Sequence, residues 1–266
     1  MTDQRNSTSK LHRSPIRWMG GKALLAKQLI ELFVPHHCYV EAFGGGGALF
    51  FNKEKSKVEV YNDVNSDLVN FFRILRYHPE PLIQELELVP NSREEFEAYL
   101  QHPGFTDIQK AARWFFLNAN SFGGRNEYFA ASKKSGGGAS SSNGNPMSSL
   151  RETAQRFDKV AVENLDFSEC LRRYDSPETL FFLDPPYIRG ATYKDRMALD
   201  QHRLLAEILP SLKGHWLLTY DDVPEVREWY AGCEFVGVST AKGIGNTLGR
   251  EKTPRLPQLI IRRRHD

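Results

Sequence analysis

The stretch YVEAFGGGGALFF, residues 39–51, decides the fold class of this chain. Residues 39–43 have the composition of a short strand, Gly44–Gly47 form a glycine turn, and residues 48–51 are expected to open a helix. A second strand is expected over residues 58–61, with a further helix after it. A strand, a glycine turn, a helix and another strand in this order indicate the start of a doubly wound α/β sheet.

The middle of the chain changes from this alternation to helical spacing. Residues 79–121 contain capping-box patterns at Ser92 and Thr106, and a loop rich in glycine and serine follows at residues 121–149. A third capping box, beginning at Ser149, is expected to restart a helix. Further strands are expected over residues 160–163, 179–183, 215–219, 234–239 and 258–261, with helices over residues 200–212 and 224–230.

These elements define the expected domain organisation. Residues 1–76 and 156–266 supply about seven strands to one discontinuous α/β domain. Residues 77–155 interrupt this domain as a mainly helical insertion with a flexible loop. A length of 266 residues suits one large domain that carries such an insertion.

Composition limits the classes of protein to which the chain can belong, whereas its net charge does not. The net charge of +2 neither requires nor excludes a nucleic-acid partner. The three cysteines are widely spaced, and His36-His37-Cys38 lacks the second ligand pair of a structural zinc site, so neither disulfides nor a metal are expected. No apolar run has the length of a membrane span, and the first ten residues lack the apolar segment of a signal peptide. We expect a cytoplasmic protein with no membrane partner, and a monomer as the default.

An acidic residue follows the glycine turn at a spacing typical of nucleoside sites. Asp63 ends the second strand, 19 positions after Gly44, and an acid near this spacing binds ribose hydroxyls in dinucleotide folds. The four glycines allow a ligand to approach the backbone closely. The alternative is a purely structural tight turn in which Asp63 caps the helix that follows.

The phosphate-binding patterns fit this chain poorly. A dinucleotide fingerprint needs three glycines at fixed spacing, and Gly44–Gly47 do not supply it. A P-loop needs Ser or Thr after its lysine, whereas Lys22 is followed by Ala23. ATP and NAD are therefore disfavoured, and S-adenosylmethionine is the common nucleoside ligand that carries no phosphate.

The stretch LDPPY, residues 183–187, ends a strongly apolar strand. Because prolines cannot donate to a sheet, the strand stops near Asp184, which leaves this acid and Tyr187 at the end where open α/β sheets bind ligands. A carboxylate and a proline-fixed carbonyl can accept both N–H bonds of an exocyclic amine and stabilise the charge that develops when it attacks a methyl group. The tyrosine ring can stack on the base. A plain strand end closed by a Pro-Pro turn is the alternative.

Four segments in order resemble the motifs of the DNA adenine methyltransferase (Dam-like) family. They are Arg17–Lys22, Glu41–Phe50, Tyr61–Leu68 and Asp184–Tyr187. The resemblance implies a seven-stranded, Rossmann-like methyltransferase sheet with a mainly helical target-recognition insertion. It also implies transfer of a methyl group from S-adenosylmethionine to N6 of an adenine flipped out of double-stranded DNA, with S-adenosylhomocysteine as product.

The resemblance further implies roles for individual residues. The target base would be held by Asp184, Pro185, Pro186 and Tyr187. The cofactor would contact Trp18, Lys22, Glu41, Phe43, Gly45, Gly47, Asp63, Asp166, Phe167 and Asp184. Within this set, Asp63 would hold the ribose hydroxyls, and Asp166 and Phe167 would border the cofactor adenine. Tyr193 and Lys194 are expected over the flipped nucleotide. Ala42 departs from the family, which often has proline there.

The insertion resembles the family only loosely, so the sequence leaves the recognised bases open. The candidates for DNA contact are Asn120, Arg125, Asn126, Lys133 and Lys134. Arginine reads guanine and asparagine reads adenine in the major groove, while lysine usually meets phosphate. A solvated polar loop is the alternative for each of them. Methylation of cytosine N4, methylation of RNA and a catalytically inert DNA-binding module also stay open as activities.

Overall fold

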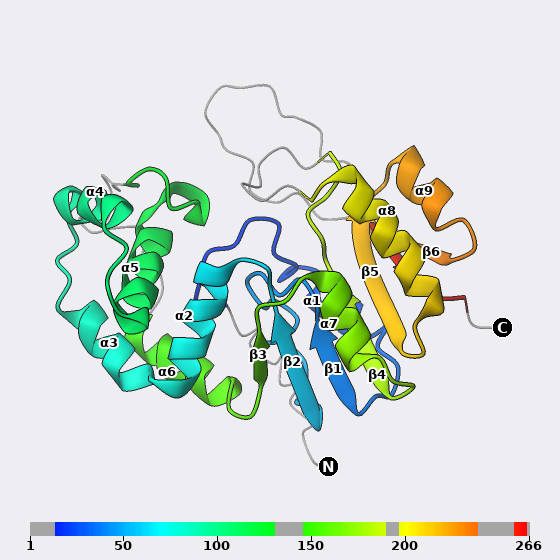
Figure 1. Cartoon of the computed structure of the whole chain (residues 1–266), viewed down its shortest axis with the longest axis horizontal. Coiled ribbons are helices and arrows are strands. Elements are labelled where there is room, and N and C mark those ends of the chain that lie inside the picture. The colour runs from blue at the N-terminus through cyan, green and yellow to red at the C-terminus, as the bar shows by residue number, and fades with distance from the viewer. Residues whose placement is uncertain (1–13, 131–145, 190–196, 239–257, 265–266) are drawn as a thin grey trace, which may run out of the picture.

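The computed structural model describes residues 14–130, 146–189, 197–238 and 258–264 (Figure 1). Its strands form one sheet in the order β3-β2-β1-β4-β5-β7-β6. They are β1 (Cys38–Glu41), β2 (Val58–Asn62), β3 (Ala161–Glu163), β4 (Thr179–Leu183), β5 (His215–Asp221), β6 (Glu234–Val238) and β7 (Gln258–Arg262). The pairs from β3 to β5 are parallel, and β7 is antiparallel to both of its neighbours. The α/β fold with seven strands predicted from the sequence is confirmed.

The order of the strands reverses at β1, near the centre of the sheet. The chain proceeds from β1 outward to β2 and β3, then returns to the other side of β1 with β4. Residues that follow the carboxyl ends of β1, β2 and β4 therefore meet at one edge of the sheet. Open α/β sheets bind their ligands at this reversal point. The arrangement brings the glycine turn, Asp63 and Asp184 to the same place.

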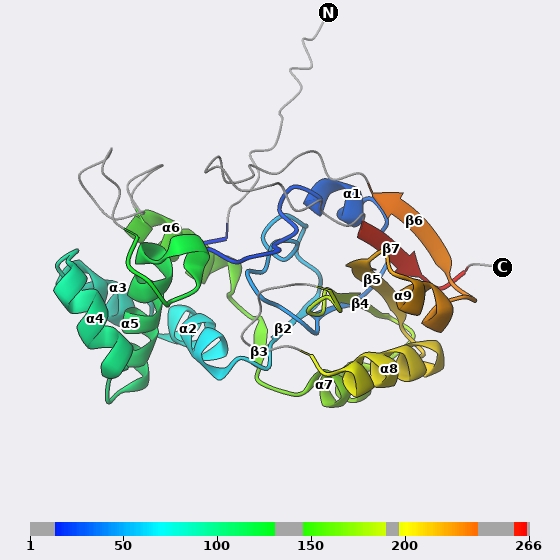
Figure 2. The ribbon, with the colours of Figure 1, turned by 90° about the horizontal axis from the view of Figure 1, so that it is seen from above.

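Helices cover both faces of the sheet. α7 (Phe167–Tyr174) and α8 (Leu199–Ile208) lie along one face, and α1 (Ala26–Ile30) lies on the other (Figure 2). α9 (Pro224–Trp229) adds Val226 to the core on the α7 and α8 side. All five residues of β4 are buried, with Phe181 in the core of one face and Phe182 in the core of the other. This burial on both faces explains the unbroken apolar run before Asp184.

The other helices gather at the end of the sheet that carries β3 (Figure 1). They are α2 (Ser66–Tyr77), α3 (Pro79–Glu87), α4 (Arg93–Gln101), α5 (Asp107–Asn120) and α6 (Pro146–Arg156). α5 packs against α2, α3 and α4. As predicted, Thr106 begins α5 with a full capping box, and the Ser92 side chain caps α4 by accepting from the Glu95 N–H.

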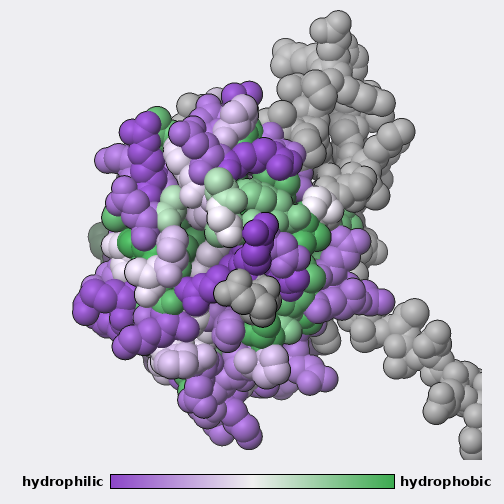
Figure 3. All heavy atoms as spheres, turned by 90° about the vertical axis from the view of Figure 1, so that its right-hand side faces the viewer, coloured by the Kyte–Doolittle hydropathy of each residue, from purple (hydrophilic) through white to green (hydrophobic). Residues whose placement is uncertain are grey.

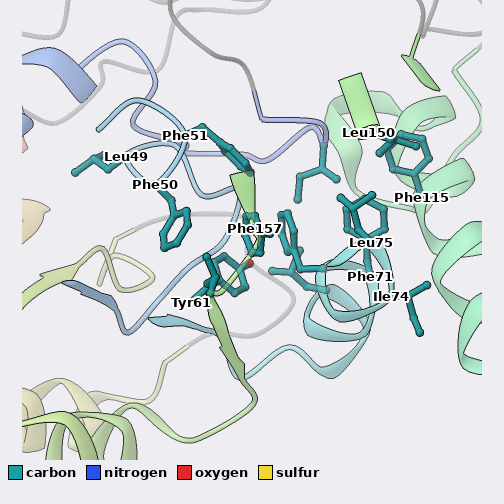
Figure 4. Close-up of a cluster of buried hydrophobic side chains, with 14 of the residues drawn as sticks. Leu49, Phe50, Phe51, Tyr61, Phe71, Ile74, Leu75, Phe115, Leu150 and Phe157 are labelled. Atoms are coloured by element: carbon teal, nitrogen blue, oxygen red, sulfur yellow. The ribbon is translucent and has the colours of Figure 1, made fainter. Parts of the chain in front are cut away.

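Aromatic rings join this group of helices to the sheet (Figure 4). Phe71 of α2 stacks on Phe115 of α5 with ring centroids 5.2 Å apart, and Phe72 stacks at 4.9 Å on Phe157, which follows α6. Phe157 in turn lies 5.1 Å from Phe50, beside the glycine turn. The helices and the sheet therefore share one continuous hydrophobic core.

Charged side chains attach both ends of the helical segment, residues 77–155, to the sheet. At its exit, the Arg156 guanidinium donates two hydrogen bonds, 2.5 and 2.9 Å long, to the Glu59 carboxylate of β2, which also accepts from Lys53 Nζ at 2.6 Å. At its entrance, Arg76 of α2 donates to the Val160 carbonyl just before β3. Removing one partner of a buried ion pair is strongly destabilising, so the Arg156–Glu59 pair holds the exit of the segment firmly on the sheet. The hydrogen bond from Arg76 ties the entrance to the chain just before β3.

Two expected helix starts differ in the structure. Residues 48–51 form turns rather than a helix. The Asn52 side-chain amide donates to the Ala48 carbonyl at 2.7 Å and so competes with a backbone ladder at this point. α6 begins at Pro146 rather than at Ser149, in line with the preference of proline for the first helical position. The short helices α1 and α7 were not predicted.

The side of the molecule that carries α9 and β6 shows hydrophobic atoms in a central band between hydrophilic ones (Figure 3). β6 is the edge strand of the sheet on this side. Among the residues that the structure describes, no helix combines the length and the apolar content needed to cross a bilayer.

Candidate active site

Glycine is required in the turn after β1 because aromatic rings pack against it on both sides. A side chain on Gly44 would collide with the Tyr61 ring, and one on Gly45 would lie 2.5 Å from the Trp18 indole nitrogen. Gly45 and Gly47 also adopt φ angles of +47° and +65°, which residues with side chains rarely adopt. The Tyr61 hydroxyl fixes the turn by donating to the Gly45 carbonyl at 2.6 Å. The turn is thereby fixed between the Tyr61 and Trp18 rings.

Asp63 braces the glycine turn from the end of β2. Its Oδ2 accepts from the Gly45 N–H at 2.8 Å, and its Oδ1 accepts from the Asn65 N–H at 2.9 Å. α2 is capped by Asn65, whose side chain accepts from the Leu68 N–H, so the alternative in which Asp63 caps this helix is wrong. Asp63 is 9% exposed and lines the cavity. Since a carboxylate accepts up to four hydrogen bonds, bracing the turn does not prevent contact with ligand hydroxyls.

Two buried donors hold the Asp184 carboxylate where β4 ends. Lys22 Nζ donates to its Oδ2 at 2.7 Å, and the Thr219 hydroxyl of β5 donates to its Oδ1 at 2.6 Å. Lys22 also donates to the Gly20 carbonyl at 2.9 Å, which ties the segment around Lys22 to this strand end. The Asp184 side chain is 19% exposed and lines the same cavity as the glycine turn. The carboxylate is thus oriented before any ligand arrives.

The Tyr187 ring is fixed in a stack of aromatic groups. It lies nearly parallel to the Tyr220 ring at a centroid distance of 6.0 Å, and Lys22 Nζ lies 4.9 Å from its centroid. Tyr220 forms a hydrogen bond with Nδ1 of the buried His202 ring. Burial raises the pKa of Tyr220 well above its ordinary value, so this hydroxyl stays protonated. Tyr187 therefore presents a flat surface of fixed orientation.

A second pair of aromatic rings borders the cavity near Asp63. Phe43, after β1, stacks on Phe167 at the start of α7, with centroids 5.5 Å apart and ring planes at 26°. Asp166 caps α7 by accepting from the Ser168 N–H at 2.9 Å. Phe43, Asp166 and Phe167 all line the cavity, so the structure brings these three predicted residues together.

Glu41 ends β1 at the floor of the cavity and is almost completely buried. Its Oε1 accepts from the Tyr39 hydroxyl at 2.9 Å. Burial raises the pKa of Glu41 to about 8, although the hydrogen bond from Tyr39 and the charge of Lys53 act in the opposite direction. Glu41 is therefore mostly protonated at neutral pH.

Replacing Glu41 by glutamine should change how stability depends on pH. The wild-type folded state holds a proton on Glu41 up to about pH 8, whereas the unfolded chain loses it near the ordinary value of 4.5. The folded state thus binds more protons across this window, and the free energy of unfolding falls as pH rises through it. Glu41→Gln should gain stability relative to wild type from pH 5 to pH 8, as measured by urea denaturation. If the free energy of unfolding changes with pH in the same way in both proteins, this prediction is wrong. Glu94→Gln, at an exposed position, is the control and should follow wild type.

The groups described above open on one cavity of about 1770 Å³. A pocket for one small ligand typically measures about 300–1,000 Å³, so there is room for a nucleoside and a second group. The predicted residues that line it are Trp18, Lys22, Glu41, Phe43, Gly45, Asp63, Arg125, Asn126, Asp166, Phe167, Asp184, Pro185, Pro186 and Tyr187. Gly47 shapes the turn without lining the cavity. In the described ranges, no group of three His, Cys, Asp or Glu side chains could hold a metal ion.

The predicted DNA contacts have different positions in the structure. Arg125 and Asn126 line the cavity, and the Asn126 N–H donates to Ser121 Oγ at 2.9 Å. Asn120 is buried and its amide donates to the Phe116 carbonyl within α5, so the structure does not present this side chain to a ligand. Lys133, Lys134, Tyr193 and Lys194 lie outside the described residues.

Three polar residues that organise the site were not among the sequence candidates. Thr219 orients Asp184, and Asn118 of α5 binds the segment that carries Trp18. The Asn62 amide donates to the carbonyls of Ala42 and Leu165 and accepts from the Leu165 N–H at 2.9 Å, which joins the ends of β1, β2 and β3. Both Thr219 and Asn62 follow apolar strand residues and are fully buried, and a polar residue at that place is a usable signal.

Comparison with known proteins identifies the family of the chain. The model of the D12 class N6 adenine-specific DNA methyltransferase family matches residues 18–244. The DNA adenine methylase of Escherichia coli (strain K12) is 24% identical over 265 residues, which cover 91% of this chain and 93% of the relative. The DNA adenine methylase of Haemophilus influenzae is 24% identical over 274 residues, 94% of this chain and 93% of the relative.

A third relative is the DNA N-6-adenine-methyltransferase of Escherichia phage P1, 26% identical over 241 residues, which cover 84% of this chain and 31% of that longer protein. The family resemblance inferred from the four sequence motifs is confirmed. Adenine is the methylated base of this family, which removes cytosine N4 methylation and the inert module as alternatives. Because the family model spans well over half of the chain, the chain belongs to the D12 class of N6 adenine-specific DNA methyltransferases.

Proposed function

We propose that the cavity binds S-adenosylmethionine against the glycine turn and holds an adenine, flipped out of double-stranded DNA, at Asp184–Tyr187. One observation carries this proposal: Lys22 and Thr219 hold the Asp184 carboxylate at a strand end that shares its cavity with the glycine turn. A carboxylate that is already oriented can accept from an exocyclic amine without reorganising.

The cavity walls suit a cationic nucleoside better than a phosphate ligand. Where the strand ends meet, these walls carry the carboxylates of Asp63 and Asp166, which attract positive charge and repel phosphate. Lys22, the cation at this place, is already paired with Asp184. S-adenosylmethionine, when bound, supplies a methyl group carried by a positively charged sulfur. Asp63 would accept from its ribose hydroxyls, and the stacked pair Phe43 and Phe167 would border its adenine. Gly44, Gly45, Gly46 and the Trp18 indole that packs on Gly45 all line this cavity, so a ligand bound there would meet the turn and this ring together.

The contribution of the chain to methyl transfer is positioning and electrostatics. Asp184 and the Pro185 carbonyl would accept the two N–H bonds of the target amine, which draws its lone pair out of conjugation with the ring. As positive charge develops on that nitrogen, the Asp184 carboxylate stabilises it. Tyr187, supported by Tyr220, would stack on the base. Because N6 lies inside the duplex, the adenine must leave the stack to reach these groups.

We assign DNA recognition to the helical segment at residues 77–155. Arg125 and Asn126 line the cavity at the end of α5, and Lys110 and Arg113 of α5 add positive charge to the same cavity. Guanidinium and amide groups read bases, whereas lysines position the phosphate backbone. Lys133 and Lys134 stay proposed phosphate contacts because of their charge. Tyr193 and Lys194 stay proposed contacts of the flipped nucleotide on the strength of the family resemblance. A monomer that acts in the cytoplasm completes the proposal.

Isotope labelling tests this assignment directly. The chain should be incubated with mixed-sequence plasmid DNA and S-adenosylmethionine that carries a deuterated methyl group. Mass spectrometry of the digested nucleosides should then show deuterated N6-methyladenine and no deuterated N4-methylcytosine. Label on cytosine would contradict the base assignment. Absence of label from DNA, with S-adenosylhomocysteine binding seen by calorimetry, would contradict the catalytic role.

A further inference from the structure

The side chain of Asn118 binds two loops that belong to different parts of the proposed mechanism. Its Oδ1 accepts from the Arg17 N–H at 2.8 Å, and its Nδ2 donates to the Arg17 carbonyl at 3.0 Å. The same Nδ2 donates to the Gly124 carbonyl at 3.0 Å. Asn118 is 1% exposed, and its amide makes three bonds to backbone groups of these loops. An amide is the side chain that can accept from one backbone group and donate to two others.

The first of these loops leads into the cofactor and catalytic groups. Arg17 is followed by Trp18, whose indole packs on Gly45 of the glycine turn. Four residues further on, Lys22 donates to the Asp184 carboxylate at 2.7 Å. A displacement of the Arg17 backbone would therefore move the residues on which the cofactor and the target amine depend.

The second loop carries the DNA candidates that line the cavity. Gly124 precedes Arg125 and adopts a φ of +73°. A side chain at Gly124 would collide with the Arg17 carbonyl, so the two backbones touch at this point. Arg125 Nε also donates to Met19 Sδ at 3.1 Å. The loop that faces DNA is thus packed directly on the loop that faces the cofactor, and Asn118 of the rigid helix α5 joins them.

We infer that Asn118 couples cofactor binding to DNA recognition, so that each ligand raises the affinity of the chain for the other. The inference rests on the proposed function, since it assumes that S-adenosylmethionine and DNA use these two loops. Coupling requires one element whose position both ligands bias, and linkage then makes the effect reciprocal. Because the Asn118 amide bonds to the backbones of both loops, a ligand that shifts one loop would also shift the other. Asn118 acts as a positioning residue, because its contacts are to the two loops.

Asn118→Asp is the sharpest test of this joint. Aspartate keeps the shape and the acceptor toward the Arg17 N–H, but it loses the two donated bonds and places a charge beside two carbonyl oxygens. Gly124→Ala opens the same joint from its other side and leaves Asn118 intact. Asn70→Asp is the matched control, because Asn70 Nδ2 donates to the Asp107 carbonyl and so joins α2 to the far end of α5.

The measurement is a binding cycle on the full chain. Single-molecule sequencing of DNA from cells that express the wild-type enzyme first identifies the methylated sequence. Calorimetry then gives the affinity for S-adenosylhomocysteine with and without a saturating duplex that contains this sequence. Wild type and Asn70→Asp should show coupling of about fivefold or more, the usual scale for linked sites. In Asn118→Asp and Gly124→Ala the coupling should fall below about twofold, with the same loss in the duplex titration.

The outcomes separate this inference from the proposed function. If wild type binds neither S-adenosylhomocysteine nor the duplex, the proposed function fails and the inference fails with it. If wild type binds both but shows no coupling, or if the variants keep the wild-type ratio, only the inference fails. If Asn118 is purely structural, Asn118→Asp should lower the melting temperature and weaken the binding of both ligands. The ratio between the affinity with duplex and the affinity without duplex would then stay at its wild-type value, and that result also contradicts coupling.

Discussion

Replacing Asp184 by alanine is expected to lower kcat for DNA methylation by at least about a hundredfold, the effect of removing one preorganised group that stabilises transition-state charge. In the proposed mechanism this carboxylate stabilises the positive charge on the amine, and Lys22 and Thr219 hold it in one orientation. Single-turnover kinetics with labelled S-adenosylmethionine and plasmid DNA would measure the change. Binding of S-adenosylhomocysteine and DNA would be measured beside it.

A second variant at this position separates chemistry from stability. Alanine leaves the buried Lys22 ammonium without its carboxylate, and such a loss typically costs about 3–5 kcal/mol. Asp184→Asn keeps the shape and an acceptor oxygen, so its activity should fall while more of its stability is kept. Asp175→Asn is the matched control, because this carboxylate accepts from the N–H groups of Lys213 and Gly214 away from the cavity. Wild-type kcat in a folded Asp184→Ala protein would refute the assigned role.

Replacing Asp63 by alanine is expected to weaken S-adenosylhomocysteine binding by about tenfold to a hundredfold. A hydrogen bond to a charged group is worth about 1.5–3 kcal/mol, and the variant loses both the proposed ribose contact and the brace on the glycine turn. Calorimetry in the absence of DNA would measure the dissociation constant directly.

The series at Asp63 should be graded. Asp63→Asn keeps one acceptor oxygen but must turn an amide toward either the Gly45 or the Asn65 N–H, so its affinity should fall between wild type and Asp63→Ala. The melting temperature should follow the same order, because the brace contributes to stability without any ligand. A dissociation constant within twofold of wild type in Asp63→Ala would show that the carboxylate braces the turn only.

The sheet and the strand-end residues were predictable because each depends on local sequence. Four consecutive apolar residues stopped by Pro185 and Pro186 indicate a short buried strand that ends just before Asp184, and β4 ends at Leu183. The glycines and Asp63 carry a spacing that reports a turn directly. The helix expected after Gly47 failed for a local reason as well, since the Asn52 side chain takes a carbonyl that the helix would have needed.

The partners of the groups that orient the site were not predictable, because each partner lies far away in the chain. Thr219 reaches Asp184 across 35 positions, and Asn118 reaches Arg17 across 101. Their neighbours in sequence give no sign of these partners. The position of Asn120 shows the converse: a motif-like context suggested a DNA contact, but packing turned this side chain into α5.

The arginine contacts at the two ends of the helical segment have a consequence for protein engineering. Arg76 at the entrance donates to the Val160 carbonyl just before β3, and Arg156 at the exit binds Glu59 within β2, so neither contact involves α3, α4 or α5. If the segment selects the target sequence, as proposed, an exchange between relatives that aims at a new target should retain both arginines together with Glu59 and Val160. A chimaera with its junctions between Arg76 and Arg156 would keep both contacts of the parent enzyme. A chimaera with its junctions outside these arginines would have to form equivalent contacts from the residues of the donor.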